Sequence, residues 1–303
     1  MKHSQKPDQQ LETEQQNSFS TALDSRSALE IAQLINDEDS KVAGAVQNSL
    51  PQVARAIESI ANAIHQGGRL IYVGAGTSGR IAALDAAECP PTFNTDPKAV
   101  QFVIAGGEKA LSRATELSED SRKMGVRDLA RRKPGKKDVV VGVTASGKTP
   151  YTVAALEFAR RKGARTVAVV CNPGSELGQI AEIEIVTEVG PEALSGSTRM
   201  KAGTAQKMVL NMLTTGAMAR LGYIYGNLMV NAHTKNRKLV ERGIGILESA
   251  ANVDRATARQ ALRRAGNSAA VALIMLKTGL DRAQSAQKLK RAKGNVRRAI
   301  DGR

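Results

Sequence analysis

The chain contains 303 residues, of which 42% are hydrophobic and 3% aromatic, with no tryptophan. This composition predicts a core of small aliphatic side chains on helices and sheet rather than an aromatic-rich binding platform. The longest apolar stretch, 269–276, is too short to span a bilayer, and the N-terminal segment lacks the apolar region of a signal peptide, so we expect a soluble cytoplasmic protein.

The formal net charge is +15, and residues 254–303 supply most of it, with thirteen lysines or arginines and three acids. A basic tail can contact nucleic acid or an anionic surface. Because no zinc-finger spacing and no interleaved aromatic residues accompany it, a solvated basic face is the favoured interpretation.

The first predicted elements are helical. Residues 1–20 are rich in Gln, Glu and Ser and are expected to be disordered. Helical patterns then occupy 27–39 and 49–68, the second with a proline in its first turn and a Gly-Gly stop at its end.

Strands and helices alternate from residue 69 onward. Five β-branched runs lie at 69–73, 99–104, 138–143, 165–170 and 182–186, and helical segments follow the first four at 79–88, about 108–131, 151–162 and 175–181. Apolar strands joined by helical crossovers predict an α/β fold with a doubly wound, parallel, five-stranded sheet, which we place in a domain of residues 21–236. A long helix is expected over 198–221. Residues 237–303, where only helical patterns occur, are expected to form a small basic domain of three or four helices.

Three of the strands lead into loops that combine glycine with hydroxyl side chains: GAGTSG after the first, TASGKTP after the third and GPEALSGSTRMK after the fifth. The carboxyl ends of parallel strands share one edge, where helix N–H groups and hydroxyls can hold an anion, and each hydrogen bond to a charged acceptor contributes roughly 1.5–3 kcal/mol. We therefore predict a phosphomonoester site that needs no metal. Its expected members are Gly76, Thr77, Ser78, Ser146, Gly147, Thr149, Ser197, Thr198 and Lys201.

The first of these loops, Gly74-x-Gly76-x-x-Gly79, also has the spacing of a dinucleotide-binding loop. Such a site needs an acidic residue at the end of the second strand to hold the ribose hydroxyls. Here the second strand ends in Ala-Gly-Gly at 105–107, and Pro90-Pro91 is expected to end the first helix after about ten residues. This context disfavours a nucleotide, and no cofactor is predicted.

The motifs GAGTSGR, ECPPT, IAGGE, ASGKTPY, GPE, GSTRMKAGTAQK and GNLMVN follow one another along the chain. Their order and spacing resemble the N-acetylmuramic acid 6-phosphate etherase family from about residue 11 to residue 239, and ECPPT and STRMKAGTAQK are the most specific of them. The resemblance implies the sugar isomerase (SIS) fold and a homodimer with its site near the interface. It also implies cleavage of the D-lactyl ether of N-acetylmuramic acid 6-phosphate, giving N-acetylglucosamine 6-phosphate and D-lactate in cell-wall recycling.

The resemblance further implies two catalytic carboxyl groups. Glu88 of ECPPT would be the acid that protonates the departing lactate, and Glu119 the base that removes the C2 proton of the ring-opened sugar. Glu88 lies beside the proline pair, where partial shelter is expected to raise the pKa of its carboxyl. Glu119 is expected to share a helix with Glu116 and Asp120. The reaction requires no metal, and Cys89 is interpreted as a small buried residue rather than a nucleophile.

Four residues depart from the pattern of that family: Lys148 stands for an arginine, Asn231 for an aspartate, Ala87 for a serine and Glu12 for a threonine. They leave both glutamates intact but bear on affinity and substrate choice. Two alternatives remain open on the same fold, a non-catalytic sugar-phosphate-binding regulator and a phosphosugar isomerase. The regulator could lose either glutamate, and the isomerase needs a base but no acid at C3. The expected partner is a small sugar phosphate and not a nucleic acid.

Overall fold

The chain divides into two compact units in the computed structural model, which describes residues 11–113, 118–232 and 237–302. The first unit is the chain up to Asp85 together with Val100–Leu213, and the second is Ala86–Ala99 together with Thr214–Arg303. The boundary expected after residue 236 therefore lies within the second unit. Helices α4 (Gly76–Phe93) and α8 (Lys201–Leu221) each continue from one unit into the other.

A parallel five-stranded sheet forms the centre of the first unit, as predicted. In the order β2-β1-β3-β4-β5, its strands are Val100–Ile104, Leu70–Gly74, Val139–Val143, Arg165–Val170 and Ile183–Val186. Every residue of β1 and β3 is buried, which is the pattern of a parallel sheet covered on both faces. All five strands consequently end at the same edge.

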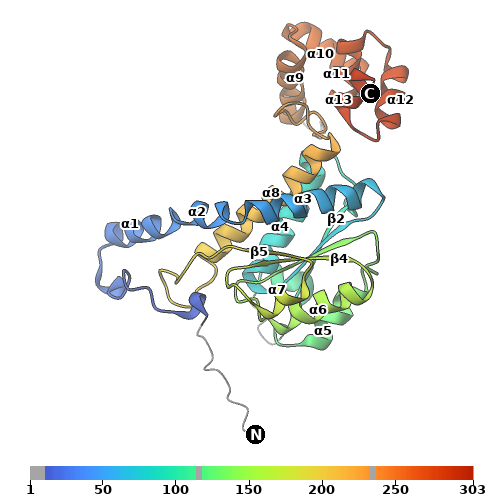
Figure 1. Cartoon of the computed structure of the whole chain (residues 1–303). Helices are drawn as coiled ribbons and strands as arrows, with labels where there is room; N and C mark the ends of the chain where they lie inside the picture. Colours follow the sequence, from blue (N-terminus) through green and yellow to red (C-terminus); the bar gives the residue numbers. More distant parts are fainter. Residues whose placement is uncertain (1–10, 114–117, 233–236, 303) are drawn as a thin grey trace. The chain divides into compact units, whose positions relative to one another are not determined.

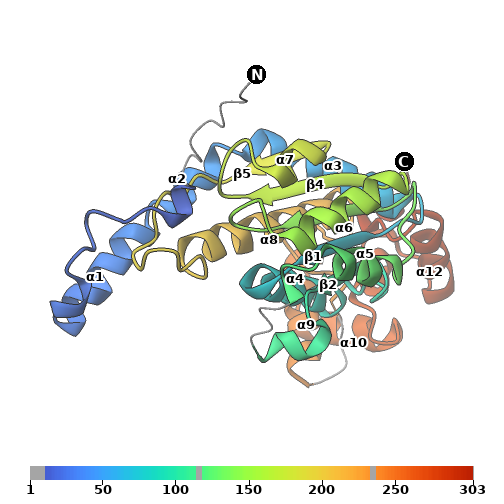
Figure 2. The same ribbon diagram turned by 90° about the horizontal axis from the view of Figure 1, so that it is seen from below.

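Helices cover both faces of this sheet (Figures 1 and 2). On one face, α3 (Leu50–His65) contacts β1, β3 and β5. On the other, α6 (Pro150–Arg161) contacts β1, β3 and β4, and α7 (Glu176–Ile180) contacts β4 and β5. Helix α5 (Arg122–Ala130) packs on α6.

A buried carboxylate joins β1, α4 and α8. Asp85 is 4% exposed, and its side chain accepts hydrogen bonds from the Tyr72 hydroxyl at 2.9 Å and from Asn211 Nδ2 at 2.7 Å. A buried charge needs such partners to offset its desolvation. The three residues thereby fix α4 against the strand that precedes it.

The segment predicted to be disordered, 1–20, is structured in its second half, so that part of the prediction is wrong. Residues 1–10 lie outside the described residues. The 3₁₀ helix η1 (Glu12–Glu14) follows. Its Thr13 is fully buried, and the Thr13 hydroxyl accepts a hydrogen bond from Asn172 Nδ2 at 3.2 Å. The polar composition of this segment gave no sign that Thr13 contacts Asn172. Short helices η2 (Leu23–Ser25), α1 (Ala28–Asp39) and α2 (Val42–Gln47) lead from there to α3.

Helix α4 does not end at its proline pair, contrary to the sequence-based expectation. It runs to Phe93 and contains both Pro90 and Pro91. A proline there lacks the N–H that would bond to the carbonyl four residues earlier, but its fixed φ is helical, so the chain keeps a helical course through this last turn at the cost of those hydrogen bonds. The Asn94 N–H then donates to the Pro90 carbonyl at 2.9 Å, and the left-handed Asn94 (φ 54°) ends the helix.

The helix expected over about 108–131 is likewise not continuous. The 3₁₀ helix η3 (Gly107–Leu111) comes first, and α5 begins only at Arg122. The Ser121 side chain caps α5 by accepting a hydrogen bond from the Met124 N–H. Glu119 and Asp120 therefore lie in a turn before α5, whereas Glu116 lies outside the described residues.

Over the described residues 237–302, the second unit contains five helices rather than the expected three or four: α9 (Arg237–Ala251), α10 (Arg255–Arg264), α11 (Ala269–Thr278), α12 (Arg282–Arg291) and α13 (Val296–Asp301). Its core includes Leu247, Leu273 and Val296, each fully buried. Asn231 Nδ2 donates to the Tyr223 carbonyl at 2.9 Å, which an aspartate could not do. None of the helices in the described residues combines the length and apolar character needed to cross a bilayer.

The contact between α5 and α6 yields the first prediction. A Cβ on Gly125 would lie 2.1 Å from the Tyr151 carbonyl oxygen, so Gly125→Ala must push the two helices apart. We expect the free energy of unfolding to fall by about 1–3 kcal/mol. Gly44→Ala in α2, where nothing lies within 4 Å of the new Cβ, is the matched control and should be neutral or slightly stabilising. Urea denaturation followed by circular dichroism measures both, and equal midpoints for the two variants would contradict the prediction.

Candidate active site

The first hydroxyl loop joins β1 to α4 with almost no intervening chain. A Cβ on Gly74 would lie 2.9 Å from the Gly79 nitrogen, and one on Gly79 would lie 2.5 Å from Ile104 Cγ1. Two of the three motif glycines are therefore needed because strand and helix approach so closely. Helix α4 begins at Gly76, so Thr77 and Ser78, both half-buried, lie in its first turn at the carboxyl edge of the sheet.

The third motif glycine makes room for a predicted catalytic residue. Gly76 has φ +51°, and a Cβ there would lie 3.0 Å from Glu119 Oε1. The Glu119 carbonyl also accepts a hydrogen bond from the Tyr151 N–H, in the first turn of α6, at 3.0 Å. Glu119 thus lies beside the start of α4 and at the start of α6, next to the first and second hydroxyl loops. The start of a helix is the positive end of its dipole, which suits a carboxylate.

The second hydroxyl loop is held together by its own hydroxyl groups. Thr144 Oγ1 lies 2.7 Å from Thr149 Oγ1 and 3.4 Å from Ser146 Oγ, and the Lys148 N–H donates to Ser146 Oγ at 3.2 Å. Thr144 is 4% exposed and was not among the predicted residues. The feature of the sequence that could have identified Thr144 is its position directly after β3. It organises the two hydroxyls that the sequence did predict.

Gly147 in the same loop has φ +71°, and a Cβ there would lie 2.4 Å from Ser175 Oγ. Ser175 is the N-cap of α7, accepting from the Gly178 N–H, and the Gly147 carbonyl accepts from the Leu177 N–H at 2.9 Å. Gly147 therefore has a packing role, and it fixes the second loop against α7.

The third hydroxyl loop meets the first at Gly203 of α8. A Cβ on Gly203 would lie 3.5 Å from Thr77 Cγ2 and 3.6 Å from the Thr198 carbonyl oxygen. The backbone of Ser197 and Thr198 forms tight turns, with the Ser197 N–H donating to the Leu194 carbonyl at 2.9 Å. The predicted members of the first and third loops are thus neighbours.

Lys201 does not have the role predicted for it. Its side chain is 3% exposed, and its ammonium forms a buried ion pair with Glu38 Oε2 of α1 at 2.5 Å. The sequence could not reveal this because the two residues are 163 positions apart. Burial alone would raise the pKa of Glu38, but hydrogen bonds from Lys201 and Lys41 outweigh it and hold that pKa below its usual value.

A carboxylate of the chain itself already binds the N–H groups at the start of α8. Glu192 of the GPE motif is fully buried, and its carboxylate accepts hydrogen bonds from the N–H groups of Lys201 at 2.9 Å and Ala202 at 3.0 Å. Burial raises the pKa of this carboxyl, although both amide hydrogen bonds act in the opposite direction. These two amides are therefore not available to a phosphate, and the anion-binding capacity rests on α4 and on the hydroxyl groups.

Glu88 lies farther along α4, and its side chain is exposed. The expectation that the proline pair shelters it is wrong for the single chain, because the helix continues past Glu88 instead of folding back at that point. The neighbouring Cys89 is 2% exposed, as predicted for a small buried residue.

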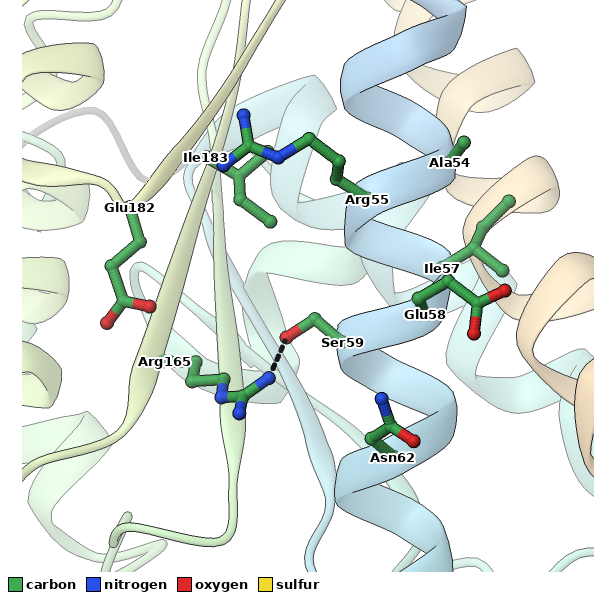
Figure 3. A pocket seen from close by; sticks show the side chains of 9 residues that line it. All are labelled: Ala54, Arg55, Ile57, Glu58, Ser59, Asn62, Arg165, Glu182 and Ile183. Atoms are coloured by element: carbon green, nitrogen blue, oxygen red, sulfur yellow. Dashed lines mark hydrogen bonds between the residues drawn. The ribbon is translucent and has the colours of Figure 1, made fainter.

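A cavity of about 600 Å³ lies at the opposite edge of the sheet, where β4 and β5 begin. Figure 3 shows Arg55 of α3 and Arg165 of β4 reaching into it, and Arg165 donates a hydrogen bond to Ser59 Oγ at 3.4 Å. None of its lining residues belongs to a hydroxyl loop. Within the described part of the chain, no three His, Cys, Asp or Glu side chains gather closely enough to hold a metal ion.

Two family models match the chain: the glucokinase regulatory protein N-terminal SIS domain over residues 52–160 and the SIS domain over residues 126–216. The N-acetylmuramic acid 6-phosphate etherase of Edwardsiella ictaluri is 50% identical, over 96% of this chain and 97% of its own length. The etherase of Clostridium beijerinckii is 46% identical, over 96% of this chain and 95% of its own length. Among solved structures, a phosphoheptose isomerase from Francisella tularensis is 17% identical and shares the fold, with a TM-score of 0.50 over 63% of this chain and 98% of that one.

Thr144 provides a test of the hydroxyl loops. Thr144→Val keeps the shape of the side chain but removes its hydroxyl, and the loss of one hydrogen bond should weaken the binding of inorganic phosphate about five- to tenfold. Isothermal titration calorimetry measures this. The control is Thr166→Val, which removes a buried hydroxyl in β4 toward the amino edge of the sheet and should leave phosphate affinity unchanged. Equal affinities for both variants would show that Thr144 does not organise the site.

The buried ion pair gives a prediction about stability. Glu38→Gln leaves the Lys201 ammonium buried without its carboxylate and should lower the free energy of unfolding by about 3–5 kcal/mol. Adding Lys201→Met removes the orphaned charge, so the double variant should regain part of that loss. Thermal and urea unfolding of Glu38→Gln, of Lys201→Met and of the double variant measure the coupling. Strictly additive losses would mean that the two side chains do not interact.

Proposed function

The chain belongs to the N-acetylmuramic acid 6-phosphate etherase family, and we propose that it acts through its three hydroxyl loops together with Glu88 and Glu119. It is an enzyme that cleaves the D-lactyl ether of N-acetylmuramic acid 6-phosphate to N-acetylglucosamine 6-phosphate and D-lactate, a step of amino sugar recycling. A non-catalytic regulator or an isomerase is not favoured, because relatives matched over nearly their whole length carry the etherase name.

The three loops would bind the 6-phosphate of the sugar. In support, α4 starts directly at the strand edge with Thr77 and Ser78 in its first turn, and Gly203 brings Thr77 close to the third loop. Ser146 and Thr149 add hydroxyl donors from the second loop, with Thr144 as their common partner. A phosphate held by backbone amides and hydroxyls requires no metal.

The observation that carries the catalytic proposal is the carboxylate of Glu119 beside Gly76, at the edge where the phosphate would sit. Opening the sugar ring exposes the C1 aldehyde, which acidifies the C2 proton. Glu119 would take that proton, the C3–O bond would break, and Glu88 would protonate the departing oxygen to give D-lactate. Water would then add to C3 of the unsaturated aldehyde, and the proton would return to C2. Each carboxyl group would contribute roughly 10²–10⁴-fold.

We also propose that the enzyme is a cytoplasmic homodimer. Phe19 and Leu29 of the N-terminal region are 70% and 69% exposed. A contact with a second chain would cover these two apolar side chains.

The two glutamates can be separated by isotope experiments. Incubation with N-acetylmuramic acid 6-phosphate in heavy-oxygen water should release D-lactate and place the label in the sugar phosphate, and absence of lactate would refute the activity. Glu88→Ala should lose turnover but still exchange the C2 proton with deuterated solvent, because its base is intact. Glu119→Ala should lose both. Loss of exchange in Glu88→Ala would overturn the assignment of acid and base.

A further inference from the structure

Arg80 of the GAGTSGR motif has no role in the reaction as proposed above. It lies one turn after Gly76 on α4, so the two residues share a face of that helix. A charged residue at this place suggests a ligand for the phosphate. In the structure, however, its guanidinium is directed to backbone carbonyls, with Nε donating to the Ala110 oxygen at 2.9 Å and Nη2 donating to the Arg113 oxygen at 3.1 Å. Arg80 therefore binds the segment of chain that follows β2.

The segment that Arg80 binds leads to the proposed base. It leaves β2, passes through η3 and continues to Glu119. Ala110, in η3, is 1% exposed, so the first hydrogen bond ends at a closely packed residue. Arg113 is exposed, and only five residues, 114–118, separate it from Glu119. The second hydrogen bond thus lies near Glu119 along the chain.

The first two turns of α4 hold this segment at two points. Arg80 binds the carbonyls of residues 110 and 113, and Gly76 leaves room for Glu119, whose Oε1 would lie 3.0 Å from a Cβ at position 76. Both contacts come from one face of one helix. Without Arg80, the free stretch of chain before Glu119 would begin at η3 instead of at residue 113, and a longer free stretch has more conformations.

We infer that Arg80 is a positioning residue for Glu119: its two hydrogen bonds fix the 110–113 segment on α4 and thereby keep the Glu119 carboxylate beside Gly76. The inference rests on the role of Glu119 as the base, as proposed above. A base must lie within hydrogen-bond reach of the proton that it removes, and a displacement of about 1 Å costs up to about 100-fold in rate. Arg80 thus governs the rate of C2 proton removal and not the affinity for phosphate.

Arg80→Met tests the inference, because methionine keeps an unbranched side chain but donates no hydrogen bond. We expect C2 proton exchange with deuterated solvent and D-lactate release to fall together by about 10- to 100-fold. The affinity for inorganic phosphate, measured by isothermal titration calorimetry, should not change. Arg80→Lys keeps the charge and a donor but loses the planar fork, so its exchange rate should lie between those of Arg80→Met and the unmodified chain.

Arg160→Met is the matched control. Arg160 Nη1, on α6, also donates to a backbone carbonyl, that of Ile180, at 3.3 Å, but it does not bind the segment that carries Glu119. Its removal should leave both C2 exchange and phosphate affinity unchanged. Backbone hydrogen exchange, followed by mass spectrometry, gives a measurement that does not depend on catalysis. The peptide covering 106–113 should exchange faster in Arg80→Met than in the unmodified chain.

An unchanged rate of C2 exchange in Arg80→Met would overturn the inference. A loss of phosphate affinity as large as the loss of C2 exchange would also overturn it, because Arg80 would then belong to the phosphate site. Failure of the proposed function has a different signature: Glu119→Ala would still exchange the C2 proton, or the unmodified chain would release no D-lactate.

Discussion

The close approach of β1 and α4 is the constraint on which the candidate site depends. Gly74 and Gly79 have no room for a side chain, so the strand turns into the helix at once and presents the first turn of α4 at the carboxyl edge of the sheet. The parallel sheet brings the second and third hydroxyl loops to the same edge. Asp85 then holds α4 to β1 and α8 from within the unit. The glycine pattern thus serves backbone packing, and in our proposal the hydroxyl groups supply the chemistry of the anion site.

A second constraint is electrostatic. The chain places its own carboxylates at two helix starts, Glu192 at α8 and Glu119 beside α4. Glu192 is fully buried and bonded to two amides, which is a structural arrangement that closes the third loop. Glu119 is only half-buried and lies next to the hydroxyl loops, where a bound substrate could reach it, as the proposed base must. We therefore propose different uses for the same residue type at similar positions, with burial distinguishing them.

The sheet could be predicted from sequence because buried parallel strands are continuous β-branched runs, which leave a local signal. The loops could be predicted for the same reason, since glycine and hydroxyl residues follow those runs directly. The wrong predictions concern residues whose partners lie far away in the sequence. Lys201 was assigned to phosphate because nothing near it in sequence indicates Glu38, and Thr13 was assigned to a disordered segment because Asn172 is equally remote. The expectation that a proline pair ends a helix also failed, because Pro90 and Pro91 lie in the last turn of α4.

The central claim is that three separate loops form one phosphate site at the carboxyl edge of the sheet. Hydrogen exchange measured by mass spectrometry, with and without saturating N-acetylglucosamine 6-phosphate, addresses it most directly. We expect slower exchange in peptides covering 74–80, 144–150 and 194–203, and unchanged exchange around 54–62 and 165, at the opposite edge. Protection confined to that opposite edge, or to one loop alone, would contradict it.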